Sequence, residues 1–139
     1  MTPEEIYKFA KEHPHCFLAT LEKEQPRVRG IHIFRINENG LIFHTAKIKS
    51  LYSQLCNHKR GEFCFIDFQN PTQVRIAGTL EEIVDVQLKE EIVEEREYLK
   101  PLVAKGGLDG LAVFSMKKAS AIWWSLQDIM GKPEPVKLF

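Results

Sequence analysis

Residues 27–50 read RVRGIHIFRINENGLIFHTAKIKS and predict two strands joined by a hairpin and followed by a helix. Arg27 to Ile36 is predicted as a long strand, and Asn37 to Gly40 has the Asn and Gly content of a hairpin connection. Leu41 to Thr45, the return strand, is rich in the aromatic and β-branched residues that suit a pleated surface. Leucines and a tyrosine at three- and four-residue spacing then predict a helix over Lys49 to His58.

Similar patterns on both sides of this unit predict further strands and two more helices. The other expected strands are residues 15–21, 62–68, 73–84, 111–116 and 119–126. The other expected helices are residues 3–13, which Thr2 and Glu5 begin with a capping box, and residues 86–99. Gly78 interrupts one strand and is interpreted as a bulge, while residues 131–139 are expected to form an extended arm. Short connections favour antiparallel pairing. We therefore predict a single domain, residues 1–139, of the mainly β (α+β) class: a six- to seven-stranded antiparallel barrel with about three helices.

Composition excludes several function classes. Lysine plus arginine number 19 and aspartate plus glutamate number 19, so the chain lacks the basic excess that nucleic-acid surfaces need. No run approaches the roughly 18 apolar residues of a spanning helix, so no membrane partner is expected. Cys16, Cys56 and Cys64 are odd in number and form no CxxC pair. They fit free thiols, and with a polar N-terminal segment they lead us to expect a cytoplasmic protein.

A cluster of basic residues and hydroxyls is the best candidate for a binding site. Arg27 and Arg29 lie two apart on a predicted strand and therefore share one face. Two adjacent guanidinium groups repel each other unless an anion or solvent lies between them. The simpler alternative is that both arginines lie on a solvated face of the sheet.

The segment after the hairpin adds donors of the kind that bind phosphate. Thr45 and Ser50 supply hydroxyls, Lys47 and Lys49 supply ammonium groups, and a helix N-terminus with free N–H groups follows. Each charge-assisted hydrogen bond contributes about 1.5–3 kcal/mol, so three or four are enough to hold a phosphate monoester. The alternative is that the lysines only increase solubility.

Other conspicuous residues have simpler interpretations. Trp123 and Trp124 face opposite sides of a predicted strand, so one can lie beside a ligand or at a subunit contact, but core packing is the simpler role. The glycine-rich residues 106–110 lack the lysine of a phosphate-binding loop and are expected to form a connection. Five scattered histidines supply no set of ligands with metal-site spacing, and no carboxylate pair stands out as an acid and base.

Five stretches, in this order and spacing, resemble the pyridoxamine 5'-phosphate oxidase-like FMN-binding split barrels. They are FLATL (17–21), QPRVRGI (25–31), NGLIFHTAKIKSLYSQL (39–55), EFCFIDF (62–68) and QVRIAGTLEEI (73–83). The resemblance covers about residues 14–85 and implies a split-barrel fold. It also implies a homodimer with flavin mononucleotide (FMN) at the subunit interface.

The resemblance also implies which residues bind FMN. Carried over by position, they are Arg29 with its strand, His44 and Thr45, Lys49 with Ser50, and Gln73. Together with Arg27, Lys47 and Trp123, chosen from the residues themselves, these complete the predicted cofactor site. The family's Arg-x-His substrate motif has no counterpart in residues 125–139, which contain neither residue. The substrate therefore stays unassigned.

The function expected from this resemblance is that of an FMN-dependent oxidoreductase acting on a small redox substrate, with NAD(P)H as a candidate donor. In such enzymes the cofactor carries the redox chemistry and the protein orients it. Two alternatives remain open at this stage: a non-catalytic carrier of flavin or haem, and a reductase that uses the deazaflavin F420.

Overall fold

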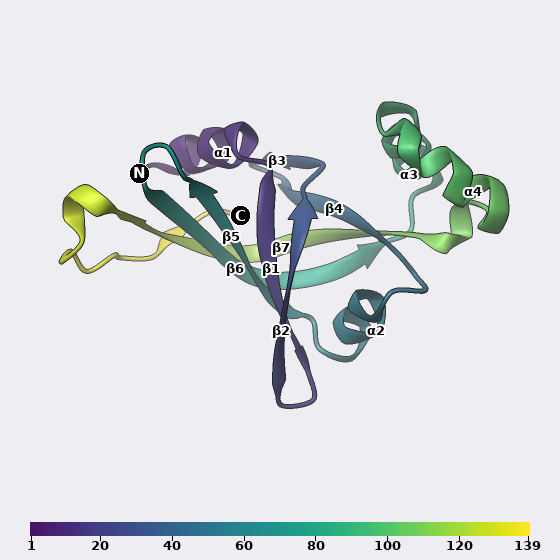
Figure 1. Cartoon of the computed structure of the whole chain (residues 1–139), viewed down its shortest axis with the longest axis horizontal. Coiled ribbons are helices and arrows are strands. Elements are labelled where there is room, and N and C mark those ends of the chain that lie inside the picture. The colour runs from purple at the N-terminus through teal and green to yellow at the C-terminus, as the bar shows by residue number, and fades with distance from the viewer.

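The computed structural model describes residues 1–139 as one eight-stranded antiparallel sheet with four α-helices around it (Figure 1). The strands are β1 (His15–Glu22), β2 (Gln25–His32), β3 (Arg35–Asn37), β4 (Gly40–Ala46), β5 (Arg60–Asp67), β6 (Thr72–Ile83), β7 (Leu111–Ser125) and β8 (Val136–Lys137). The helices are α1 (Pro3–Glu12), α2 (Ser50–Asn57), α3 (Val86–Glu95) and α4 (Lys100–Gly106). The predicted fold class is confirmed, with one more strand and one more helix than expected.

The sheet closes on itself through a bent segment of the chain. Its strands follow the order β2-β1-β5-β6-β7-β4-β3, so β2 and β3 lie at opposite ends of the sheet although only two residues separate them in sequence. Ile33 donates its N–H to the Pro14 carbonyl at 3.1 Å, and Phe34 donates to the Ile42 carbonyl at 2.8 Å. The predicted strand over residues 27–36 is thus two strands with a bend. No ladder joins β2 to β4, which leaves the barrel split along this side.

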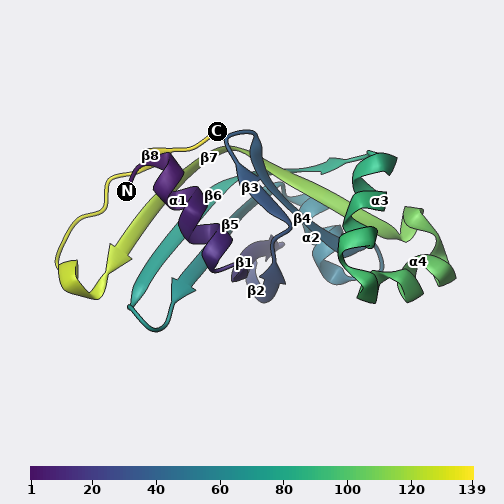
Figure 2. The same cartoon turned by 90° about the horizontal axis from the view of Figure 1, so that it is seen from above.

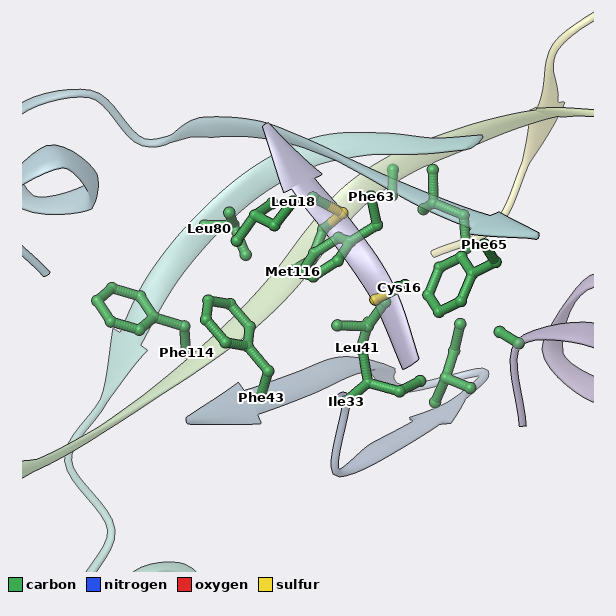
Figure 3. Packing of buried hydrophobic residues seen from close by; sticks show 14 of the residues in the cluster. Cys16, Leu18, Ile33, Leu41, Phe43, Phe63, Phe65, Leu80, Phe114 and Met116 are labelled. Atoms are coloured by element: carbon green, nitrogen blue, oxygen red, sulfur yellow. The ribbon is translucent and has the colours of Figure 1, made fainter. Parts of the chain in front are cut away.

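The interior of the barrel is filled by side chains from six of its strands, many of which Figure 3 shows. Phe43 stacks on Phe114 with ring centroids 5.6 Å apart and meets Phe63 edge-on at 5.5 Å. These rings are 0–2% exposed, and each contributes about 1.5–3 kcal/mol through burial. Because its own side chains occupy the interior, the barrel offers a ligand only its surfaces and its split side.

Helix α1 packs against the sheet and holds the C-terminal residues beside it (Figure 2). Thr2 and Glu5 form the predicted capping box, each side chain accepting from the other's backbone N–H. The Tyr7 hydroxyl donates to the Leu138 carbonyl at 2.9 Å. The extended arm predicted over residues 131–139 also contains a short strand, β8, which pairs with β7.

Strand β7 corrects one prediction. The expected strands 111–116 and 119–126 are a single 15-residue strand, which continues through an irregularity at Lys118. The pairing of β6 with β7 changes register between Ala77 and Thr79, so the bulge predicted at Gly78 is confirmed. A Cβ on Gly78 would lie 2.9 Å from Ala119 Cβ, closer than carbon atoms approach in folded proteins. The bulge lets β7 follow the curvature of the barrel as one long strand, although its sequence pattern predicts two strands.

The predicted helix 86–99 is also wrong in its last four residues. Helix α3 ends at Glu95 because Arg96 has non-helical angles, φ −118° and ψ 79°. A single 3₁₀ turn follows over Glu97–Leu99, and α4 then begins with Pro101 in its first turn, the position that proline tolerates best. Both helices lie at the end of the sheet near α2 and β4 (Figure 2). No helix of the protein is long and apolar enough to cross a membrane.

Candidate functional site

A cleft of about 660 Å³ lies on the split side of the barrel, where β2 and β4 separate. The start of α2 borders it on one side, and the turn between α3 and α4 borders it on another. Its lining residues are Arg29, Gly30, Ile31, His32, His44, Thr45, Ala46, Lys49, Ser50, Leu51, Arg96, Tyr98, Leu99, Leu102 and Leu111. This volume is in the range of pockets that hold small molecules and cofactors.

The cleft brings together five of the nine predicted cofactor-binding residues. These are Arg29, His44, Thr45, Lys49 and Ser50, which come from β2, β4 and the start of α2. They lie far enough apart in sequence that only the bent strand and the hairpin bring them to one place.

The other four predicted residues lie outside the lining of this cleft. Arg27 is exposed and its Nη2 lies 3.0 Å from Glu22 Oε1. Lys47 Nζ lies 5.9 Å from the centre of the Tyr52 ring. Gln73 and Trp123 line a second cavity of about 340 Å³. Their role in binding stays a prediction.

Arg29 is held in place by neutral acceptors. Its Nη1 donates to the Leu18 carbonyl at 3.1 Å and to Thr20 Oγ1 at 2.6 Å, and its Nη2 donates to Gln54 Oε1. Thr20 and Gln54 are buried. Burial lowers the pKa of Arg29, and the nearby Arg27 charge lowers it further, but an arginine stays protonated at neutral pH. The site thus contains a fixed, half-buried positive charge.

The N-terminus of α2 opens into the cleft without a side-chain cap. Lys49 is the N-cap residue, with an extended backbone and no capping hydrogen bond from its side chain. Ser50 and Leu51, the first residues of the eight-residue helix, line the cleft. Uncapped N–H groups and the positive end of the helix dipole favour an anion here. The adjoining Thr45 hydroxyl and Lys49 ammonium group provide further donors.

His44 is paired with an arginine that the sequence analysis missed. Arg96 Nη1 donates to His44 Nε2 at 2.8 Å and to the His32 carbonyl at 3.0 Å, and Arg96 Nη2 donates to the Ile33 carbonyl at 2.6 Å. Because arginine has no acceptor, His44 Nε2 must accept and its proton must lie on Nδ1. Burial, with the positive charges of Arg96 and Lys49 and the nearby His32, lowers the pKa of His44 to about 4. His44 is therefore neutral at physiological pH and offers an N–H donor.

The remaining wall of the cleft is apolar. Tyr98 is 64% exposed, and Leu99, Leu102 and Leu111 lie beside it in the lining. The cleft thus has a basic, hydroxyl-rich end and an apolar end. A ligand with a phosphate and a flat aromatic body matches both, and FMN is such a ligand. Arg96 and Tyr98 belong to a predicted helix in the sequence, and only the break after Glu95 turns them into the cleft.

The second cavity lies on the outer face of the sheet, away from the cleft. Gln73 pairs with Trp124 across β6 and β7, so these two side chains share that outer face. Trp123 pairs with Val74 and packs partly against the core. Trp124 is therefore the tryptophan on the face of Gln73, although the sequence analysis selected Trp123.

Comparison with known proteins adds independent findings. The sequence profile of the pyridoxamine 5'-phosphate oxidase family matches residues 2–118. None of the curated proteins compared matches the chain.

Solved structures of the same fold come from several bacteria. A nimc/nima family protein of Clostridium acetobutylicum is 24% identical with a TM-score of 0.78, over 97% of this chain and 91% of that one. A protein of the same bacterium, related to general stress protein 26, is 15% identical with a TM-score of 0.76, over 98% and 94%. A pyridoxamine 5'-phosphate oxidase-related, FMN-binding protein of Nostoc punctiforme is 14% identical with a TM-score of 0.60, over 98% and 95%.

At these identities the solved structures show the fold alone, and they agree with the split barrel described above. The family profile, in contrast, spans most of the sequence, including both strands that border the cleft and the start of α2. On that match, the chain belongs to the pyridoxamine 5'-phosphate oxidase family.

Proposed function

We propose that this protein binds FMN in the cleft between β2 and β4 and acts as an FMN-dependent oxidoreductase. One observation carries the proposal: Arg29, Lys49 and the hydroxyls of Thr45 and Ser50 converge at an uncapped helix N-terminus, in a cleft with no acidic lining residue. Membership of the family and the FMN-binding relative from Nostoc punctiforme support the choice of FMN.

The charges of this end of the cleft match a phosphate monoester. Such a group carries a charge of about −1.5 to −2 at pH 7, and Arg29 with Lys49 supplies two positive charges. Each charge-assisted hydrogen bond adds about 1.5–3 kcal/mol. Gln54 and Thr20 fix the Arg29 guanidinium before the ligand arrives, so little side-chain entropy is lost on binding.

The chain's own residues bind and orient, while bound FMN would supply the hydride-transfer chemistry. His44 is fixed as a neutral donor through Nδ1–H, so it can hydrogen-bond an acceptor without adding a charge. Leu99, Leu102 and Leu111 exclude water from the apolar end of the cleft.

We further propose a two-fold homodimer formed through the outer face of the sheet. Phe17 (44% exposed) and Val28 (70% exposed) lie on that face, in the same alternation as Gln73 and Trp124. Exposed apolar groups gathered on one sheet face are typical of a protein interface. A dimer would cover them and bring the second cavity of one subunit toward its partner, which would give Gln73 a place in the complete site.

Titration with FMN tests the proposal. Purified protein should be yellow or should quench flavin fluorescence on titration, and Arg29→Ala and Lys49→Ala should each weaken FMN binding about tenfold, the value of one charge-assisted bond. Arg35→Ala is the control, because Arg35 is paired with Glu91 outside the cleft, and it should change affinity less than twofold. Unchanged FMN titrations in both cleft variants would remove the site assignment.

Turnover separates an enzyme from a carrier. Oxidation of NADH or NADPH by the FMN-loaded protein with an electron acceptor supports catalysis, whereas stoichiometric binding without turnover supports a carrier. The absorption spectrum distinguishes FMN from a deazaflavin or haem. His44 Nε2 already accepts a hydrogen bond from Arg96, so this nitrogen is not a free axial ligand for haem.

A further inference from the structure

The cleft contains two arginines that have no carboxylate partner. Outside the cleft, arginines at positions 27, 35 and 75 each form an ion pair with a glutamate, and the exposed Arg60 donates to the Thr79 hydroxyl. Arg29 and Arg96, the two in the cleft, donate only to carbonyls, a hydroxyl, an amide and an imidazole. A half-buried cation without a counterion is unfavourable unless an anion binds beside it.

The phosphate proposed above accounts for only part of this positive charge. A dianionic phosphate is neutralised by Arg29 and Lys49, which leaves Arg96 without a counterion. Arg96 reaches the cleft from a different part of the fold, the break between α3 and α4, on the side of the apolar wall. The positive charge of the cleft therefore exceeds the negative charge of the phosphate, and one further anionic group would balance it.

Arg96 also has hydrogen-bond donors to spare. Its three hydrogen bonds use both hydrogens of Nη1 and one of Nη2, so Nε–H and one Nη2–H remain. Nε and Nη2 share one edge of the guanidinium plane, and the two oxygens of a carboxylate fit such an edge. Phe34, with its ring centre 5.4 Å from the Arg96 guanidinium carbon, supports the plane from one side.

The side chains around Arg96 indicate that the rest of the ligand is apolar. Tyr98 exposes most of its ring two residues along the chain, and Leu99 and Leu102 continue the same wall. A ligand anchored at Arg96 would lay an apolar body against these side chains. His44, held by the same arginine, offers it a neutral donor.

We propose that Arg96 binds the carboxylate of a second ligand, a small apolar carboxylic acid, which lies beside the cofactor as the substrate. This assignment of a substrate class rests on the proposed function. The anion site itself is a property of the chain and is testable without FMN.

Benzoate and its neutral isostere benzamide are suitable probes, measured by isothermal titration calorimetry on the protein with and without FMN. Benzoate should bind at least tenfold more tightly than benzamide, because only benzoate carries the charge. Arg96→Gln should weaken benzoate binding at least tenfold and leave benzamide binding unchanged. Arg35→Gln is the matched control, since Arg35 lies over the same Phe34 ring at 5.2 Å but outside the cleft, and it should have less than a twofold effect.

Lys49→Ala identifies where benzoate binds. In the FMN-free protein this variant should change benzoate affinity less than twofold, and an effect as large as that of Arg96→Gln would place benzoate in the phosphate site and overturn the proposal. Equal affinity for benzoate and benzamide would overturn it too. Should Arg96→Gln fail to fold, Arg96→Lys keeps the charge without the planar edge, and a loss of less than threefold in that variant overturns the proposal.

The two proposals fail in different ways. If FMN does not bind but benzoate discriminates as described, the cofactor assignment is wrong and the Arg96 anion site stands. If FMN binds and benzoate does not discriminate, the cofactor site stands and the substrate class is wrong.

Discussion

His44 illustrates how the surroundings of one side chain decide its chemistry. A histidine in water changes charge near pH 6.5, but burial and the guanidinium of Arg96 lower the pKa of His44 to about 4. The same contact fixes the tautomer, because Arg96 donates to Nε2. The cleft thus combines permanent cations at Arg29, Lys49 and Arg96 with a donor that stays neutral.

This lowered pKa predicts a loss of stability in mild acid. The unfolded chain takes up a proton at His44 near pH 6.5 and the folded chain only near pH 4, so stability falls as the pH decreases through this window. After allowance for solvent screening, His44 should cost about 1 kcal/mol at pH 5 relative to pH 7. Urea unfolding of the wild type and of His44→Gln at both pH values measures this difference. Equal pH dependence in the two proteins would contradict the assignment.

At the scale of elements, two irregularities shape the molecule. The break after α3 turns Arg96 and Tyr98 into the cleft, and the bulge at Gly78 bends β6 against β7. Both lie in the β6-to-β7 part of the chain, which connects the barrel to the helices beside the cleft. Regular elements supply the framework, the bulge adapts the pairing of two long strands, and the break after α3 directs side chains to the cleft.

The bulge leads to a prediction about stability. In Gly78→Ala the new methyl group would lie 2.9 Å from Ala119 Cβ and from Met116 Cγ, so strands must shift to accept it. Overpacking of this kind costs about 1–3 kcal/mol. Gly106→Ala is the control, because a Cβ there meets no atom within 4 Å. Thermal unfolding should show a lower midpoint for Gly78→Ala only, and equal midpoints would show that the bulge adjusts freely.

At the scale of the whole molecule, the filled barrel decides where a ligand can bind. Phenylalanines from β4, β5 and β7 occupy the interior, so the split side and the outer face of the sheet are the surfaces left for function. The cleft lies on the first, and the exposed side chains of Phe17 and Val28 lie on the second. In the proposed dimer the outer face of the sheet meets the partner, the cleft binds the ligand, and the second cavity with Gln73 lies toward the partner.

The proposed dimer predicts a mass of 32.2 kDa in solution, twice the 16.1 kDa of one chain. Phe17→Glu would place a charge in the middle of the buried interface, at a cost of several kcal/mol, and should yield monomers. Val84→Glu, also exposed but at the end of β6, should leave the dimer intact. Size-exclusion chromatography with light scattering measures both masses. A monomeric wild type, or a dimeric Phe17→Glu variant, would contradict this arrangement.

The sequence predicted the framework well and part of the lining of the cleft. Alternating apolar residues and turn composition identified most strands, the capping box at Thr2 and the bulge at Gly78, because these features depend on neighbours in the chain. Arg29, His44, Thr45, Lys49 and Ser50 were found because they lie next to a hairpin and a helix start. Arg96 was missed because its pattern is that of a solvated helix face.

The sequence by itself determined a mainly β domain with basic and hydroxyl side chains beside a helix start, because periodicity and local turn chemistry act over a few residues. Only the tertiary structure decided how those side chains meet: the bend after β2 closes the barrel, leaves β2 and β4 apart, and lets the β6-to-β7 connection bring Arg96 against His44. Contacts between residues 52 positions apart depend on the packing of the whole chain, and no local pattern records them.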